Sequence, residues 1–236
     1  MTSAASTKPV AIAVRDLAMR SGPRELFHGL SFDVEGGQAL GVIGPNGSGK
    51  TMLLRALVGL VTPTEGRISI DGQPPRDALR TTAIAYFAGG VTLPGAVRAA
   101  AWGTLGSGAV ITPERRRIRT LSRGSRQLLG LRTVLGRHPL RLIVLDEPWE
   151  ALDPDSARWL KTTIEIKRDR GAAVVLASDR LEDLSGLCDA YLFVMGGEAT
   201  LLKSHEIASA GPVTTALLTD IFDKLRGGPP SLRIAS

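Results

Sequence analysis

The chain has 236 residues, 43% of them hydrophobic and 22% charged, which is ordinary for a globular protein and excludes a collagen, a coiled coil or a wholly disordered chain. Its single cysteine, Cys188, excludes an internal disulfide framework and a cysteine-based zinc site, and we expect it to be a small buried side chain. The net charge of +6 is compatible with nucleic acid, anionic lipid or phosphate ligands.

The N-terminal residues 1–8 are predicted to form a loose leader. They lack the apolar centre of a secretory signal, so we do not expect one here. No apolar run approaches the ~18 residues of a membrane-spanning helix. We therefore expect a cytoplasmic protein with one domain over residues 9–210, followed by a C-terminal helix and flexible tail over residues 211–236.

Strands and one helix are predicted in the first third of the chain. Apolar residues alternate over 9–14 and 30–34, which favours two strands, and Gly36-Gly37 marks a turn. The uncharged run Ala39–Ile43 is typical of a strand buried on both faces. A helix is expected over 52–58 and a further strand over 67–70, before the Asp71-Gly72 turn.

Two more buried strands are predicted over 141–145 and 172–177, with a helix over 156–170 between them. Alternation of strands and helices, with continuous apolar strands, indicates a parallel α/β sheet.

The segment from Thr81 to Thr112 has one charged residue, Arg98, and six glycines. Such a segment is expected to be buried or covered by a partner. Arginines gather directly after it, and a solvated helical face is one interpretation of that cluster: Arg115, Arg116, Arg117, Arg119, Arg123 and Arg126.

A complete phosphate-binding loop follows the Ala39–Ile43 strand. Its residues are Gly44, Pro45, Asn46, Gly47, Ser48, Gly49, Lys50 and Thr51. Glycines let successive amides turn toward phosphate oxygens, and the following helix presents its positive end to the same anion. Lys50 is expected to reach the β- and γ-phosphates, and Thr51 to bind Mg²⁺.

Carboxylates come at the end of the 141–145 strand, where open α/β sheets bind ligands. Asp146 is expected to hold Mg²⁺ through water, and Glu147 to orient or deprotonate the attacking water.

With these motifs the chain resembles the ATP-binding subunits of ABC transporters over about residues 10–205. Gly44–Thr51 is similar to Walker A, Leu142–Glu147 to Walker B, Leu121–Ser125 to a degraded signature motif, and Ala151–Asp153 to the D-loop. Within the family, Glu25–Phe32 is most similar to small exporters, including the haem exporter of cytochrome c biogenesis. The resemblance implies an α/β P-loop core with an antiparallel β subdomain and a helical subdomain, shortened here to about 89–134.

The resemblance also implies a head-to-tail dimer, homo- or heteromeric, that holds two ATP molecules with Mg²⁺. Ser122 and Gly124 of one subunit would contact ATP bound by the other. Separate permease subunits would carry the substrate and hold the chain at the inner face of the membrane, with no nucleic acid expected.

Several positions depart from the family pattern. Ala88 stands where a glutamine is usual, Asp179 where a histidine is usual, and Ser21 where an aromatic side chain often stacks on adenine. Two functions stay open: an active ATPase subunit that drives a transporter, or a degenerate, slow or non-hydrolysing subunit whose ATP binding clamps a dimer. These changes predict slow ATP hydrolysis. A soluble nucleic-acid-associated ABC protein is a third, less favoured hypothesis.

The stretch Gly89–Gly108, in which Arg98 is the one charged residue, is expected to dock a helix of the permease through Val91, Leu93, Val97, Trp102 and Leu105. The alternative is that these side chains pack into the helical subdomain.

Overall fold

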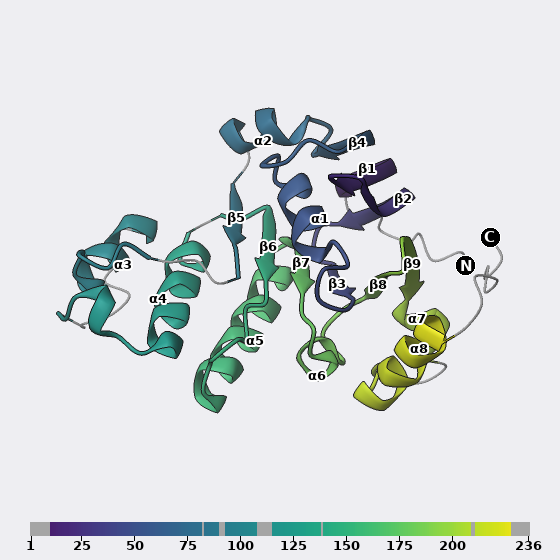
Figure 1. The fold of residues 1–236 in the computed structure, drawn as a ribbon. Coiled ribbons are helices and arrows are strands. Elements are labelled where there is room, and N and C mark those ends of the chain that lie inside the picture. Colours follow the sequence, from purple (N-terminus) through teal and green to yellow (C-terminus); the bar gives the residue numbers. More distant parts are fainter. Residues whose placement is uncertain are drawn as a thin grey trace, which may run out of the picture.

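The computed structural model describes residues 10–81, 83–89, 93–107, 115–137, 139–208 and 211–227. It consists of two sheets with helices around them and a small helical subdomain at one side (Figure 1). The predicted leader, and the tail from residue 228, lie outside the described residues.

The smaller sheet is antiparallel, with strand order β2-β1-β4. Its strands are β1 (Val10–Ser21), β2 (Arg24–Glu35) and β4 (Glu65–Ile70). All three extend beyond the runs expected from alternation alone. Alternate side chains of β2 are buried, as expected of a sheet with one face in water.

The larger sheet has the order β5-β6-β7-β3-β8-β9 and is parallel except for the final pair, β8 and β9. Its strands are β3 (Ala39–Ile43), β5 (Ile84–Phe87), β6 (Leu142–Asp146), β7 (Ala173–Ala177), β8 (Ala190–Met195) and β9 (Glu198–Lys203). Every residue of β3, β6 and β7 is buried, as their continuous apolar sequences predict.

Helix α1 (Lys50–Leu57) lies between the two sheets, and its buried leucines share one core with both. The other helices are α2 (Pro75–Thr81), α3 (Ala99–Ser107), α4 (Arg123–Leu135), α5 (Pro154–Asp169), α6 (Leu181–Leu184), α7 (Ser204–Ile207) and α8 (Thr215–Gly227). Cys188 is buried in a second core beneath α5 and α8, as predicted.

A third, small core holds the helical subdomain together. Leu93 is buried in it with Ala99, Ile118, Leu121 and Leu129, and Val97 and Trp102 pack against it half-buried. The structure therefore favours packing over docking for Leu93, Val97 and Trp102. Val91 and the side chain of Leu105 lie outside the described residues.

The arginine cluster does not form one helical face. Arg115, Arg116 and Arg117 precede a single 3-10 turn (Ile118–Thr120), and of the six only Arg123 and Arg126 lie on α4. The helical-face interpretation is wrong for Arg115, Arg116 and Arg117, because their segment pairs as extended backbone with Arg98, and Arg119 lies in the short 3-10 turn. Among the described residues, no helix is both long enough and apolar enough to cross a bilayer.

Candidate functional site

The loop between β3 and α1 contains three glycines whose close contacts or backbone angles disfavour a side chain. A Cβ at Gly44 would stand 2.2 Å from the Val194 carbonyl oxygen of β8. Gly47 and Gly49 adopt φ values of 78° and 111°, a region that favours glycine. Gly49 also begins α1 without a side-chain cap, so no side chain of the loop competes for the first turn of the helix.

This loop borders a pocket of about 270 Å³, the nucleotide pocket. The predicted residues Asn46, Gly47, Ser48, Gly49, Lys50 and Thr51 line it, together with Ser21, Leu26, Met52 and Glu147. Ser21 therefore stands at the pocket as predicted, and no aromatic side chain is among these lining residues.

Lys50 extends over the loop that would hold phosphate. It is buried, its Nζ donates to the Gly44 carbonyl at 2.7 Å, and it lies 3.9 Å from Glu147 Oε1. The ammonium group is thus already inside the site, within reach of an anion placed in the loop.

Thr51 and Asp146 meet across two elements that are 95 residues apart in sequence. Thr51 Oγ1 donates to Asp146 Oδ2 at 2.7 Å, while Asp146 Oδ1 is buried without a hydrogen-bond partner. Ser48 Oγ is also buried without a partner. A buried, unsatisfied carboxylate oxygen beside a hydroxyl fits a hard cation such as Mg²⁺.

The carboxylates do not form a metal site by themselves, because no group of three or more acidic, histidine or cysteine side chains that could hold a metal occurs within the described ranges. The residues present therefore fit a Mg²⁺ ion that arrives with phosphate oxygens as further ligands.

Glu147 occupies a strained and partly desolvated position. Its φ is 45°, unusual for a residue with a side chain, and its Oε2 accepts the Asp179 N–H at 3.3 Å. Burial, and next the nearby charge of Asp179, raise the pKa of the Glu147 carboxyl above its ordinary value. A carboxyl with a raised pKa is better matched to accepting a proton near neutral pH.

The residues similar to the signature motif, Leu121–Ser125, hereafter the signature segment, span the start of α4. Ser122 is the N-cap, and its Oγ accepts the Ser125 N–H at 3.1 Å. A Cβ at Gly124 would meet the Ala151 carbonyl oxygen of the D-loop at 2.3 Å, so the two motifs of one chain touch. Asp153 of the D-loop caps α5, and its hydrogen bonds from Ser156 lower its pKa.

Gln127 was missed by the sequence reasoning. From the second turn of α4, its Nε2 donates to the carbonyls of Glu147 and Pro148, both at 3.1 Å. Gln127 therefore links α4 to the backbone at Glu147, the predicted catalytic residue. Its position one helical turn after Gly124 was the sequence feature that could have pointed to it.

The structure brings some predicted site residues together and leaves others apart. Lys50, Thr51, Asp146 and Glu147 converge on the nucleotide pocket, whereas neither Ser122 nor Gly124 lines it. Gly89, next to Ala88, packs against Asp146, where an ideal Cβ would stand 3.0 Å from the carbonyl oxygen. Arg180 pairs with Glu182 and Asp183 at 2.9 and 3.7 Å, so it is engaged by neighbours of Asp179.

Comparisons with known proteins point to the same family as the residues of this site. Residues 27–150 match the family described as ABC transporter. Cytochrome c biogenesis ATP-binding export protein CcmA of Idiomarina loihiensis is 32% identical over 205 residues, which cover 79% of this chain and 94% of that protein. The CcmA protein of Pseudomonas aeruginosa is 36% identical, over 69% of this chain and 90% of its own.

A lantibiotic transport ATP-binding protein, SrtF of Streptococcus pyogenes, is 27% identical over 83% of this chain and 91% of its own. Among solved structures, one titled "Structure of ATP binding subunit of ABC transporter" has a TM-score of 0.78 at 20% identity, covering 89% of this chain and 99% of that one, which supports the fold. The phosphate loop, the paired carboxylates and these relatives identify the chain as a member of the ABC transporter family, an ATP-binding subunit of ABC ATPase type.

Proposed function

We propose that this chain hydrolyses ATP with Mg²⁺ at a reduced rate, in a head-to-tail dimer that drives export through separate permease subunits. The convergence of Lys50, Thr51, Asp146 and Glu147 on one pocket carries the proposal. ATP hydrolysis as such follows from the family.

Each residue of this group has a role that its contacts support. Lys50 binds the β- and γ-phosphates, and Thr51 and Asp146 hold Mg²⁺, which neutralises phosphate charge when bound. Glu147 orients the attacking water and accepts its proton at a carboxylate oxygen, a role that its raised pKa supports.

The reduced rate follows from the two replaced positions. The methyl group of Ala88 offers no hydrogen bond to water or cation, and Asp179 adds a negative charge beside Glu147. Losing a group that stabilises the transition state raises the activation barrier, and each loss of about 1.4 kcal/mol of stabilisation lowers the rate about tenfold.

The dimer is supported by the distance of the signature segment from the chain's own nucleotide pocket. Ser122 and Gly124 are at least partly exposed and outside that pocket, so a second subunit is the natural recipient of their contact. Relatives named as ATP-binding export proteins support export through a permease partner. The proposal further places the chain at the inner face of the membrane, without a nucleic-acid partner.

The rate proposal is tested by measuring phosphate release from the purified chain with ATP and Mg²⁺. We expect slow release that Glu147→Gln abolishes and Asp179→His increases, while ATP affinity stays within about threefold. A wild-type rate equal to that of Glu147→Gln, with ATP still bound, would replace the ATPase by an ATP-dependent dimer clamp.

The dimer proposal is tested by crosslinking. Asn46 and Ser122 are exposed, and the native Cys188 is buried, so Asn46→Cys and Ser122→Cys chains offer one accessible thiol each. In a Glu147→Gln background we expect mixed chains to form a disulfide only with ATP and Mg²⁺. An Asp223→Cys chain on α8, mixed with Ser122→Cys, is the control and is expected not to crosslink.

A further inference from the structure

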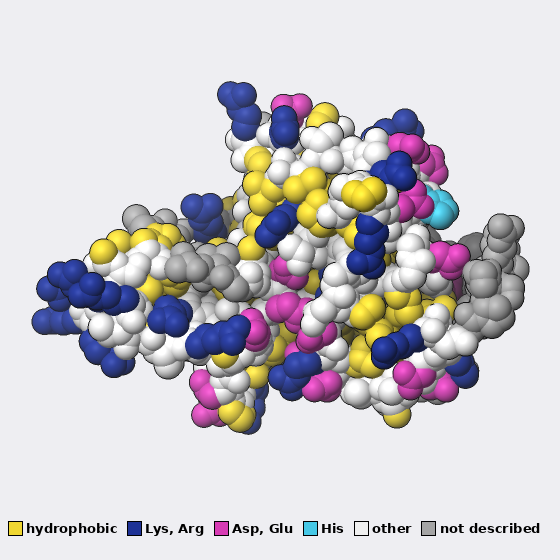
Figure 2. Space-filling view, viewed as in Figure 1, with side chains coloured by type: hydrophobic (Ala, Val, Ile, Leu, Met, Phe, Trp, Pro, Cys, Tyr) yellow, Lys and Arg dark blue, Asp and Glu magenta, His cyan; other side chains and the backbone are white. Residues whose placement is uncertain are grey.

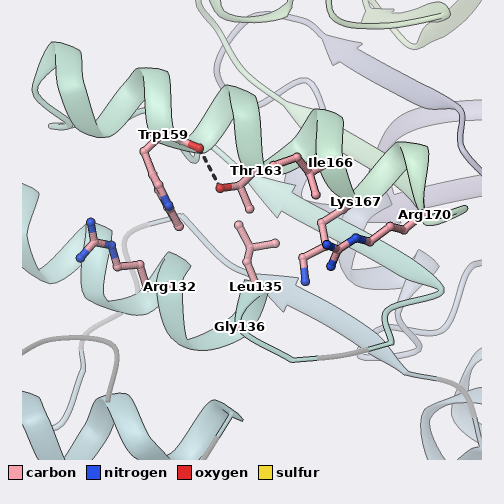
Figure 3. A pocket seen from close by; sticks show the side chains of 8 residues that line it. All are labelled: Arg132, Leu135, Gly136, Trp159, Thr163, Ile166, Lys167 and Arg170. Atoms are coloured by element: carbon pink, nitrogen blue, oxygen red, sulfur yellow. Dashed lines mark hydrogen bonds between the residues drawn. The ribbon is translucent and has the colours of Figure 1, made fainter. Parts of the chain in front are cut away.

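An open groove lies between the C-terminal half of α4 and the length of α5, outside the nucleotide pocket (Figure 3). We call it the α4–α5 groove; its volume is about 330 Å³, at the small end of the range of ligand pockets, about 300–1,000 Å³. Leu135 of α4 and Trp159 and Ile166 of α5 give it an apolar lining, and Ile166 is 44% exposed although hydrophobic.

Positive charge surrounds this apolar lining. Arg132, Lys167 and Arg170 line the groove, and no acidic residue is among its lining within the described part of the chain. The guanidinium of Arg132 lies 5.2 Å from the centroid of the Trp159 ring, which fixes it beside the apolar surface. Figure 3 shows Lys167 and Arg170 projecting from the same helix toward the end of α4.

Lys167 is the most unusual of these cations, because its residue is only 5% exposed. Its Nζ donates to the Arg137 carbonyl at 3.0 Å. Burial, and next the charge of Arg170, lower the pKa of Lys167, so its charged form is held at a cost. An anion in the groove would add a charge-assisted contact to the interactions that these cations already make.

The dimensions favour a small molecule over a protein segment. The lining covers Trp159 to Arg170 on α5 but only Arg132 to Gly136, about one helical turn, on α4, and the volume of about 330 Å³ is that of a small-molecule pocket. The apolar lining also argues against a bare inorganic anion, which would leave Trp159 and Ile166 without contacts.

We propose that the α4–α5 groove binds a small soluble anion with an apolar body, of the class of medium-chain carboxylates, and that the bound molecule restrains α4 against α5. The carboxylate lies between Lys167 and Arg170, and the apolar body covers Leu135, Trp159 and Ile166. The regulatory part of this proposal rests on the proposed function, because α4 begins at Ser122 and α5 begins directly after the D-loop.

Binding is tested with decanoate as the probe, by calorimetry and by the fluorescence of Trp159 in a Trp102→Phe, Trp149→Phe background. We expect saturable binding of one decanoate per chain, with decanol and acetate each at least tenfold weaker, since each lacks one half of the recognised chemistry. Equal binding of decanol, or no saturable decanoate binding, overturns the proposal.

Variants locate the site. Arg170→Gln is expected to weaken decanoate binding about tenfold through the lost charge, and Ile166→Asp by at least as much, because it places a carboxylate in the groove. Arg158→Gln removes an exposed arginine of α5 that pairs with Asp155 outside the groove, and is the matched control. Unchanged binding in both groove variants, or an equal loss in the control, assigns decanoate to another surface.

The regulatory part has its own readout. Saturating decanoate is expected to change the ATP turnover of the wild type at least twofold, and to leave the turnover of Ile166→Asp unchanged. If decanoate binds as described but turnover does not respond, the groove is a binding site without regulation. If the protein shows no turnover at all, the proposed function fails while the binding test stands.

Discussion

Lys50 is the residue on which we expect nucleotide binding to depend most directly. It is buried, and the phosphate loop closes around its Nζ. Because a charge-assisted contact contributes about 1.5–3 kcal/mol, Lys50→Ala is expected to weaken binding of ATP with Mg²⁺ about tenfold or more in calorimetry. Lys161→Ala, which removes an exposed lysine on α5, is the control, and equal affinities of Lys50→Ala and wild type would contradict the phosphate-loop assignment.

Glu147 predicts a specific pH dependence of turnover. Burial and the charge of Asp179 raise its pKa, so the proton-accepting carboxylate is lost as the pH falls through that raised value. Asp179→Asn removes one of the causes that raise this pKa, so the pKa of Glu147 is expected to fall. The acidic limb of the turnover profile is therefore expected to move to lower pH.

The comparison is made by measuring phosphate release over a pH series. Glu182→Gln, an exposed carboxylate on α6 that pairs with Arg180, serves as the control and should leave the limb in place. A limb that does not move in Asp179→Asn would mean that another group governs the acidic side.

At the scale of elements, the contact between α4 and the D-loop constrains the signature segment. Gly124→Ala would place a methyl group 2.3 Å from the Ala151 carbonyl oxygen, and backbone there has little room to yield. We expect a loss of about 1–3 kcal/mol in the free energy of unfolding, measured by chemical denaturation. Gly227→Ala, at the open end of α8, is the matched control and should be neutral or slightly stabilising.

The small core of the helical subdomain makes a second prediction at this scale. Trp102 packs against that core from α3, so Trp102→Ala should lower the melting temperature and cost about 2 kcal/mol or more, below the ~3–5 of a fully buried tryptophan. Thr104→Ala, at an exposed position of α3, is the control. An unchanged melting temperature would return Trp102 to the permease-facing role.

Across the whole molecule, the parts that could be predicted from sequence are the strands and loops whose pattern of residues is local. The continuous apolar runs predicted β3, β6 and β7 to within a residue or two, because strands buried on both faces have no polar alternation to obscure them. The glycine and lysine spacing likewise predicted the phosphate loop. These features need no information from distant parts of the chain.

Features that depend on distant packing were not predictable. The backbone contacts of Gln127, the positive φ of Glu147 and the packing of Trp102 against the small core of the helical subdomain depend on segments that are distant in sequence. The departure of Arg115 to Arg117 from a helical face has the same origin, since their backbone pairs with the segment before α3.

The basic residues of the molecule are concentrated in one part of the chain, which the fold gathers into the helical subdomain. Residues 89–141 contain ten arginines and a single acidic residue, Glu114, while the whole chain has 29 basic and 23 acidic residues. The rest of the chain is therefore slightly acidic. Figure 2 shows basic side chains gathered over the helical subdomain, at the left of the view.

The position of β3 in the middle of the large sheet has a consequence for the order of events during synthesis. Its two neighbours, β7 and β8, begin at Ala173 and Ala190, and Gly44 packs against the carbonyl of Val194. At 5–20 residues per second, about 150 residues take roughly 7–30 s to follow the phosphate loop out of the ribosome. A chain ending at Asp189 should accordingly bind no ATP in calorimetry, whereas one ending at Gly227 should bind like the full chain. The phosphate loop is thus synthesised early but is expected to reach its final conformation late. Until β7 and β8 have been made, β3 lacks its neighbouring strands and is open to association with other nascent chains.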